Sequence, residues 1–113
     1  MHELSIATSI LKTAEDEVAK IEGKKVKEIQ LEIGKISGIE ISSLKFVWEQ
    51  CMKGSVLEKA KVEIIEPEGF AKCAECGHEF RIENFYDSCN KCGSPFKEII
   101  TGKEMKIKRL LIN

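Results

Sequence analysis

Apolar residues recur at spacings of three and four near the start of the chain, which is the period of an amphipathic α-helix. This first helix is expected to begin near Glu3 to Ser5 and to end at Gly23, because glycine is common just beyond a helix C-terminus. Its apolar stripe consists of Ala7, Ile10, Leu11, Ala14, Val18 and Ile21. A second stripe, Leu44, Val47, Trp48 and Cys51, predicts another helix. Ser42 or Ser43 is expected to cap this helix, and Gly54 to end it.

Alternating apolar and polar residues predict strands between and after these helices. Ile29, Leu31 and Ile33 alternate with charged and amide side chains. Further strands are expected at 61–66 and 105–112. The pattern predicts an α+β fold with two helices on one face of a small mixed three-stranded sheet. We expect one domain at 1–69 plus 98–113, with a metal-binding domain inserted at 70–97.

Two C-x-x-C pairs lie in the inserted segment, and each is followed by glycine. The cysteines are Cys73, Cys76, Cys89 and Cys92. Two pairs at this separation can bring four thiolates to one tetrahedral ion, most often zinc. Because four thiolates leave no open coordination position, we interpret the lobe as a structural zinc ribbon and the protein as no enzyme. Similar hairpins hold iron in rubredoxin-like electron carriers, and this alternative stays open. His78 is interpreted as an imidazole beside the hairpin, at the surface or against the metal ligands, and the alternative is a ligand that exchanges with a cysteine or contacts another metal.

The composition and net charge of the chain limit the functions that fit it. The chain has 113 residues and a net charge of −1, so it lacks the basic balance of a typical nucleic-acid binder. Lys72, Lys91 and Lys97 keep a zinc-ribbon nucleic-acid or protein-interaction module open as the alternative. No apolar run is long enough for a membrane span. We expect a cytoplasmic protein with reduced thiols, in which Cys51 packs in the core.

The first residues are Met1, His2 and Glu3. A bulky second residue is expected to preserve Met1. The terminal amine, backbone amides and an imidazole can then lie in one plane, and planar nitrogen ligation suits Ni(II) and Cu(II). The amides are available because the first N–H groups of a helix have no partner within the helix.

The opening 1–5, the segment 33–39 and the two cysteine pairs together resemble the HypA/HybF hydrogenase nickel-incorporation family. The resemblance covers nearly the whole chain. It implies a nickel metallochaperone that works with the nickel-binding GTPase HypB. The nickel would go to the large-subunit precursor of nickel-iron hydrogenase and, in some organisms, to the urease maturation proteins.

The resemblance also implies roles for individual residues. His2 supplies an imidazole to nickel, with the Met1 amine and the backbone amides of His2 and Glu3 nearby. Glu40 falls where some family members place an acidic residue close to the nickel. Some relatives carry histidine after the second cysteine pair, where this chain has Gly93 and Ser94. This difference weakens the case for a histidine link between the zinc lobe and the nickel site.

Overall fold

The computed structural model describes residues 3–23 and 25–113. It divides into two compact units. The α/β unit comprises Met1–Leu31, Ile39–Ile64 and Ile107–Asn113. The ribbon unit comprises Glu32–Gly38 and Ile65–Lys106. Neither helix of the described residues is long and apolar enough to cross a bilayer.

Helix α1 (Glu3–Lys20) buries one side, as its periodicity predicts. The fully buried residues are Ala7, Ile10, Ala14 and Val18. Two positions of the expected stripe differ. Leu11 is only half-buried, and Ile21 lies beyond the end of the helix with 63% of its surface exposed. The helix ends before Gly23, and Glu22 is the residue that takes a positive φ, of 54°.

Helix α2 (Ile41–Cys51) begins before the serines that were expected to cap it, so that prediction is wrong. Glu40 occupies the N-cap position in an extended conformation, and its side chain makes no capping hydrogen bond. Leu44 is the buried residue of this helix. Cys51 is half-buried rather than fully in the core, and its Sγ lies 4.0 Å from Thr8 Oγ1 of α1. The two helices therefore pack against each other.

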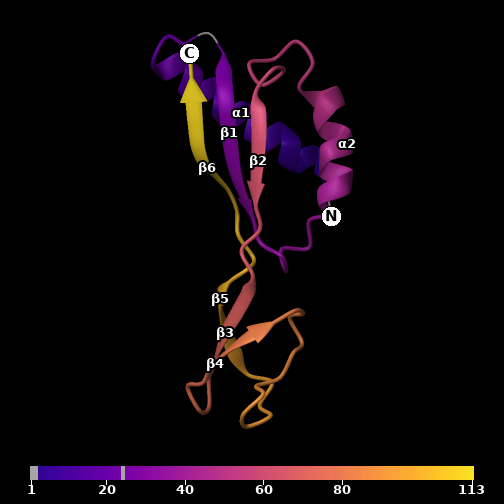
Figure 1. Cartoon of the computed structure of the whole chain (residues 1–113), viewed down its shortest axis with the longest axis vertical. Coiled ribbons are helices and arrows are strands. Elements are labelled where there is room, and N and C mark those ends of the chain that lie inside the picture. The colour runs from indigo at the N-terminus through magenta and orange to yellow at the C-terminus, as the bar shows by residue number, and fades with distance from the viewer. Residues whose placement is uncertain (1–2, 24) are drawn as a thin grey trace. The chain divides into compact units, whose positions relative to one another are not determined.

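The first sheet contains β1 (Val26–Ile33), β2 (Lys61–Ile65) and β6 (Met105–Ile112) in the order β2-β1-β6. Figure 1 draws the arrows of β1 and β2 in one direction and that of β6 in the other, so the sheet is mixed. The chain between β1 and β2 passes through α2, which is the kind of connection that parallel strands need. Ile29, Leu31 and Ile33 are each at most 1% exposed, as their alternation predicts.

The second sheet belongs to the ribbon unit and is antiparallel, with the order β4-β3-β5. Its strands are β3 (Gly69–Cys73), β4 (Glu79–Ile82) and β5 (Lys97–Thr101). The buried side chains of this unit form one small cluster of Ile36, Ala71, Cys73, Phe80, Ile82 and Cys89. Ile36 comes from the segment after β1, far from the cysteine pairs in sequence. The predicted fold class is confirmed: two helices, a small mixed sheet and a four-cysteine lobe.

Three glycines from three separate segments of the ribbon unit lie against one another. A Cβ built on Gly34 would be 1.8 Å from the carbonyl oxygen of Gly102, and one on Gly102 would be 2.6 Å from the Cα of Gly69. The Ile36 N–H donates to the Gly102 carbonyl oxygen at 2.9 Å, and the Lys35 N–H donates to that of Pro67 at 2.9 Å. These contacts fix the segment after β1 onto the ribbon unit.

Candidate metal centre

The two C-x-x-C loops of the ribbon unit have the same backbone hydrogen bonds. In the first loop, the Cys73 N–H donates to the His78 carbonyl oxygen and the Gly77 N–H donates to that of Cys73, at 2.9 and 3.0 Å. In the second loop, the Cys89 N–H donates to the Ser94 carbonyl oxygen and the Gly93 N–H donates to that of Cys89, at 2.9 Å each.

Glycine is needed at both turns because of their backbone conformation. Gly77 and Gly93 have φ values of 75° and 78°, in the left-handed region that side chains disfavour. The local sequence therefore folds two equivalent loops, each of which presents two sulfur atoms.

The four cysteine sulfur atoms converge within 4.8 Å of one another. The Cys73 Sγ lies 3.5 Å from the Cys92 Sγ, and the Cys76 Sγ lies 3.7 Å from the Cys89 Sγ. Four sulfurs bound to one zinc ion at about 2.3 Å lie about 3.8 Å apart in a tetrahedron. The donor set and its spacing therefore fit a zinc ion with four thiolate ligands.

Backbone N–H groups point at the buried sulfurs of this cluster. The Cys76 N–H donates to the Cys73 Sγ at 3.4 Å. The N–H groups of Lys91 and Cys92 donate to the Cys89 Sγ at 3.4 and 3.5 Å. Such bonds stabilise a thiolate, because they are stronger to the charged form.

These contacts move the pKa values of the thiols apart. The Cys92 N–H is the main cause that lowers the pKa of Cys89 to about 6, against a smaller opposing effect of burial. The Cys76 N–H likewise lowers the pKa of Cys73. The Ser94 backbone lowers the pKa of Cys92, but the neighbouring Cys73 thiol and burial outweigh it and raise that pKa to about 12. Without a metal, the cluster thus favours a thiolate at Cys89 and a thiol at Cys92.

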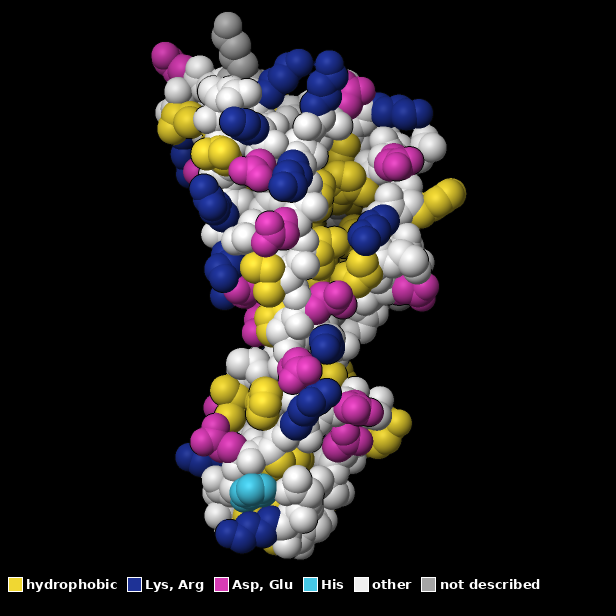
Figure 2. Space-filling model, in the orientation of Figure 1, with side chains coloured by type: hydrophobic (Ala, Val, Ile, Leu, Met, Phe, Trp, Pro, Cys, Tyr) yellow, Lys and Arg dark blue, Asp and Glu magenta, His cyan; other side chains and the backbone are white. Residues whose placement is uncertain are grey.

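The side chains around the cluster are arranged for packing and solvation. His78 is half-buried and stacks on Phe80, with ring centroids 6.2 Å apart and planes 8° apart. Lys72 and Lys91 are exposed, and the Lys97 Nζ donates to the carbonyl oxygen of Pro95 at 3.3 Å. Figure 2 shows basic and acidic side chains interspersed over the visible face. The visible face therefore lacks the basic patch that nucleic-acid binding favours.

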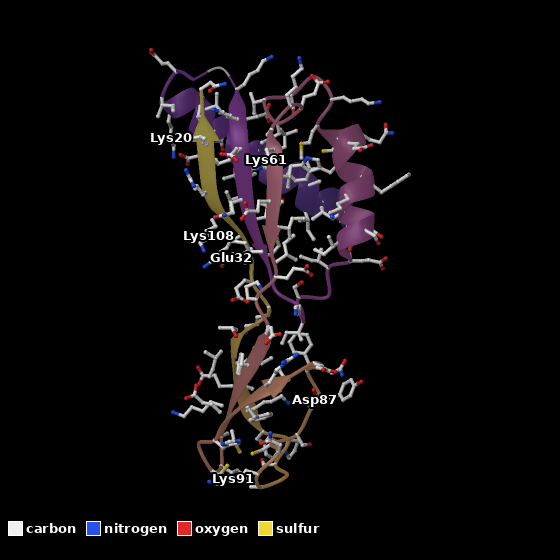
Figure 3. All side chains as sticks on the ribbon, in the orientation of Figure 1. Lys20, Glu32, Lys61, Asp87, Lys91 and Lys108 are labelled. Carbon is white, nitrogen blue, oxygen red and sulfur yellow. The ribbon has the colours of Figure 1, made fainter. Side chains whose placement is uncertain are left out.

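A turn between β4 and the second cysteine pair is held by one carboxylate. The Asp87 Oδ2 accepts hydrogen bonds from the N–H groups of Glu83 and Asn84, at 2.8 and 3.1 Å. These bonds, led by that of Glu83, lower the pKa of Asp87. Figure 3 labels Asp87 on this loop. The turn therefore sets the chain direction into Cys89.

A separate acidic cluster lies in the α/β unit. The backbone N–H of Glu40 donates to the Glu3 Oε2 at 3.3 Å, although 37 positions separate the two residues. The Ser42 hydroxyl donates to the Glu40 Oε1 at 2.8 Å. The Glu3 carboxylate of α1 thus binds the backbone of Glu40, the N-cap residue of α2. Met1 and His2, the other residues predicted to bind nickel, lie outside the described residues.

Two residues of these sites were missed by sequence reasoning. Ser42 was predicted as a helix cap, yet its hydroxyl orients the Glu40 carboxylate. Ile36 carried no predicted role in the metal lobe, yet it is buried in the same cluster as Cys73 and Cys89. The apolar character of the segment around Ile36 was the available signal, but nothing local shows which lobe it joins.

The chain matches known proteins over nearly its whole length. The family model described as "Hydrogenase/urease nickel incorporation, metallochaperone, hypA" matches residues 1–112. A hydrogenase maturation factor HypA from Francisella philomiragia is 40% identical over 113 residues, which is 100% of both chains. One of the same name from Trichormus variabilis is 43% identical, covering 97% of this chain and 94% of its own.

A solved structure shares the fold. The solution structure of the nickel metallochaperone HypA from Helicobacter pylori superimposes with a TM-score of 0.73 at 27% identity. The match covers 99% of this chain and 97% of that one.

Proposed function

The chain belongs to the HypA family of hydrogenase/urease nickel-incorporation metallochaperones, and we propose that it binds Ni(II) at its N-terminus and delivers it during nickel-iron hydrogenase maturation. The observation that carries this proposal is the hydrogen bond from the Glu40 backbone N–H to the Glu3 carboxylate of α1, at 3.3 Å. This contact brings a distant acidic residue next to the sequence position that follows His2.

The proposed nickel ligands are the Met1 amine, the His2 imidazole and the backbone amides of His2 and Glu3. Nitrogen donors in one plane suit Ni(II). Glu3 is the first described residue of α1, where backbone N–H groups lack helical partners. A carboxylate there also lies at the positive end of the helix dipole, which favours its charged form.

We assign Glu40 a supporting role at this site. Its N–H holds the Glu3 carboxylate, and its own carboxylate is oriented by the Ser42 hydroxyl. An exposed carboxylate in this position can contribute an oxygen ligand or stabilise the bound cation. Because Glu40 is exposed, nickel can also leave this site without unfolding the protein.

The four-cysteine cluster is proposed to hold a structural zinc ion. Cys73, Cys76, Cys89 and Cys92 would fill a tetrahedral shell and leave no position for water or substrate. Zinc supplies the folding free energy that a small lobe lacks, and it supplies no reaction here. The protein is accordingly proposed to be no enzyme.

The proposed partners follow from the family. Nickel would be exchanged with the GTPase HypB and passed to the large-subunit precursor of nickel-iron hydrogenase, and urease maturation proteins are further recipients in some organisms. We propose that the protein works in the cytoplasm, where its five cysteines stay reduced. No nucleic-acid or membrane partner is proposed.

Nickel affinity should fall as the pH drops through about 6. The terminal amine and the imidazole have reference pKa values of about 8 and 6.5, and protons compete with the metal at both. Equal nickel affinity at pH ~5 and ~7.5 would reject ligation by these groups.

The test is calorimetric titration of Ni(II) into zinc-loaded protein with a native, untagged N-terminus, because a tag would block the amine. His2→Ala is compared with His78→Ala, which removes the other histidine of the chain. We expect binding at micromolar or tighter Kd in the natural protein and in His78→Ala, and its loss in His2→Ala.

Equal binding in both variants would place the nickel away from the N-terminus. No binding to the natural protein would leave a zinc-only interaction or nucleic-acid module. A salt-dependent mobility shift on DNA or RNA would then favour the nucleic-acid reading.

A further inference from the structure

The two sulfur–sulfur contacts of the metal cluster each join one cysteine loop to the other. Cys73 lies against Cys92, and Cys76 lies against Cys89, at 3.5 and 3.7 Å. A disulfide bond is about 2.05 Å long, so each pair could close after a shift of about 1.5 Å. Both bonds would tie the loops together, as a shared metal ion does.

Each close pair combines one exposed cysteine with one buried cysteine. Cys76 and Cys92 are exposed, whereas Cys73 and Cys89 are only 2% and 4% exposed. A small oxidant in solution therefore meets Cys76 or Cys92 first. The sulfenic acid formed there lies against a buried sulfur of the other loop, and that sulfur can resolve it.

Hydrogen bonds oppose pairing within a loop. The sulfurs of Cys73 and Cys89 accept N–H groups from their own loops, including those of Cys76 and Cys92. A disulfide within one C-x-x-C pair would draw the buried sulfur toward its neighbour and distort these bonds. It would also leave the two loops unconnected, so that metal loss would release them from each other.

From this geometry, and from the zinc assignment of the proposed function, we propose that the ribbon unit is a peroxide-sensitive modification site. Oxidation expels zinc and forms the disulfides Cys73–Cys92 and Cys76–Cys89. The ribbon then stays folded without metal, because each cross-link closes a loop through both hairpins and constrains the unfolded chain.

The chemistry balances with hydrogen peroxide as the oxidant. In the zinc-loaded chain the exposed cysteine is a thiolate, and it attacks one peroxide oxygen, which breaks the O–O bond and gives a sulfenic acid and hydroxide. The buried thiolate then attacks the sulfenic sulfur, forms the S–S bond and expels a second hydroxide. Each disulfide thus consumes one peroxide, and zinc departs as Zn²⁺ once its thiolates are oxidised.

The sequence allows the pairing to be read directly. Cleavage after Glu75 separates Cys73 from Cys76, and cleavage after Lys91 separates Cys89 from Cys92.

The full zinc-loaded chain is treated with stoichiometric hydrogen peroxide while a chromogenic chelator reports zinc release. Remaining thiols are alkylated, the protein is digested with a glutamate-specific protease and trypsin, and disulfide-linked peptides are identified by mass spectrometry without reduction. The Cys51→Ala variant is treated in parallel, because it removes the one cysteine outside the cluster.

We expect Cys73 peptides linked to Cys92 peptides, Cys76 peptides linked to Cys89 peptides, and the same result in Cys51→Ala. Amides of β3 should keep their hydrogen-exchange protection in the oxidised, zinc-free protein and lose it in the reduced, zinc-free protein. Links within a C-x-x-C pair, links to Cys51, or zinc loss without disulfides would overturn the proposal.

The same pairing is measured on reduced protein prepared without metal and on protein whose zinc content is known. If the purified chain binds no zinc but still forms the two cross-links, the zinc assignment fails and the modification site stands. If it binds one zinc and forms other disulfides, the modification site fails and the zinc assignment stands.

Discussion

The backbone N–H of Glu40 donates a hydrogen bond to the Glu3 carboxylate, with an N···Oε2 distance of 3.3 Å. The bond joins the residue at the N-cap position of α2 to the first described residue of α1. The Ser42 hydroxyl completes the arrangement by holding the Glu40 Oε1 at 2.8 Å. The Glu3 carboxylate of α1 is therefore held by the N-cap residue of α2, and the carboxylate of that residue is held by Ser42 of α2.

Replacing the Glu40 carboxylate should weaken nickel binding without removing it. The Glu40→Gln variant keeps the backbone N–H but loses the negative charge beside the proposed nickel site. We expect the Kd for Ni(II), measured by calorimetry, to rise about tenfold, corresponding to about 1.4 kcal/mol. The Glu49→Gln variant removes an exposed charge elsewhere on α2 and should bind as the natural protein does. An unchanged Kd in Glu40→Gln would show that this carboxylate takes no part.

The glycine contacts of the ribbon unit predict a large effect of one methyl group. In Gly34→Ala the new Cβ would lie 1.8 Å from the Gly102 carbonyl oxygen, so the backbone must move. We expect the ribbon unit to lose more than about 2 kcal/mol of stability, measured by denaturant unfolding or hydrogen exchange. Gly54→Ala is the control, because nothing lies within 4 Å of its Cβ and only its φ of 74° is unfavourable. An equal loss of stability in Gly34→Ala and Gly54→Ala would contradict this steric explanation.

Local sequence patterns were enough to predict the elements that bury a regular stripe. The strand at Ile29, Leu31 and Ile33 follows a period of two, and every one of these residues is buried. The spacing of the cysteine pairs likewise predicts the convergence of the four sulfurs, because it reflects a local loop geometry that glycine permits.

Contacts between distant segments were not predictable in this way. Ile36 enters the ribbon core and Glu40 meets Glu3, but neither contact has a local period or spacing. The helix cap was mispredicted for a related reason. Ser42 is a good capping residue by type, yet its hydroxyl is taken by the Glu40 carboxylate in the folded chain.

Zinc retention should depend on pH through the cluster thiolates. The folded chain lowers the pKa of Cys89 to about 6, below the ordinary thiol value of about 8.5. A lowered pKa means that the thiolate form is favoured by folding above the ordinary value, and that this contribution is lost as the pH falls through about 6. Zinc binding to the metal-free chain must displace an additional proton, from Cys89, below pH ~6, so we expect the zinc affinity to fall more steeply with pH below about 6 than above it, measured by competition with a chelator of known affinity. A pH dependence of the affinity with the same slope from pH 7.5 to 5 would contradict this expectation.

The Asp87 carboxylate should stabilise the turn that leads into Cys89. Its Oδ2 accepts the N–H groups of Glu83 and Asn84, and the bonds to these groups lower its pKa. In Asp87→Ala both N–H groups lose this acceptor, so we expect their hydrogen-exchange protection to fall roughly tenfold or more. Asp16→Ala, which removes an exposed carboxylate of α1, should leave that protection unchanged.

The pH dependence of the Asp87 effect follows from the direction of its pKa shift. A carboxyl group with a lowered folded pKa contributes its stability fully above the ordinary value of about 3.9, and loses it as the pH falls through the lower folded value. The difference in protection between the natural protein and Asp87→Ala should therefore be constant from pH 5 to 8. A difference that shrinks within that range would mean that another group holds the turn.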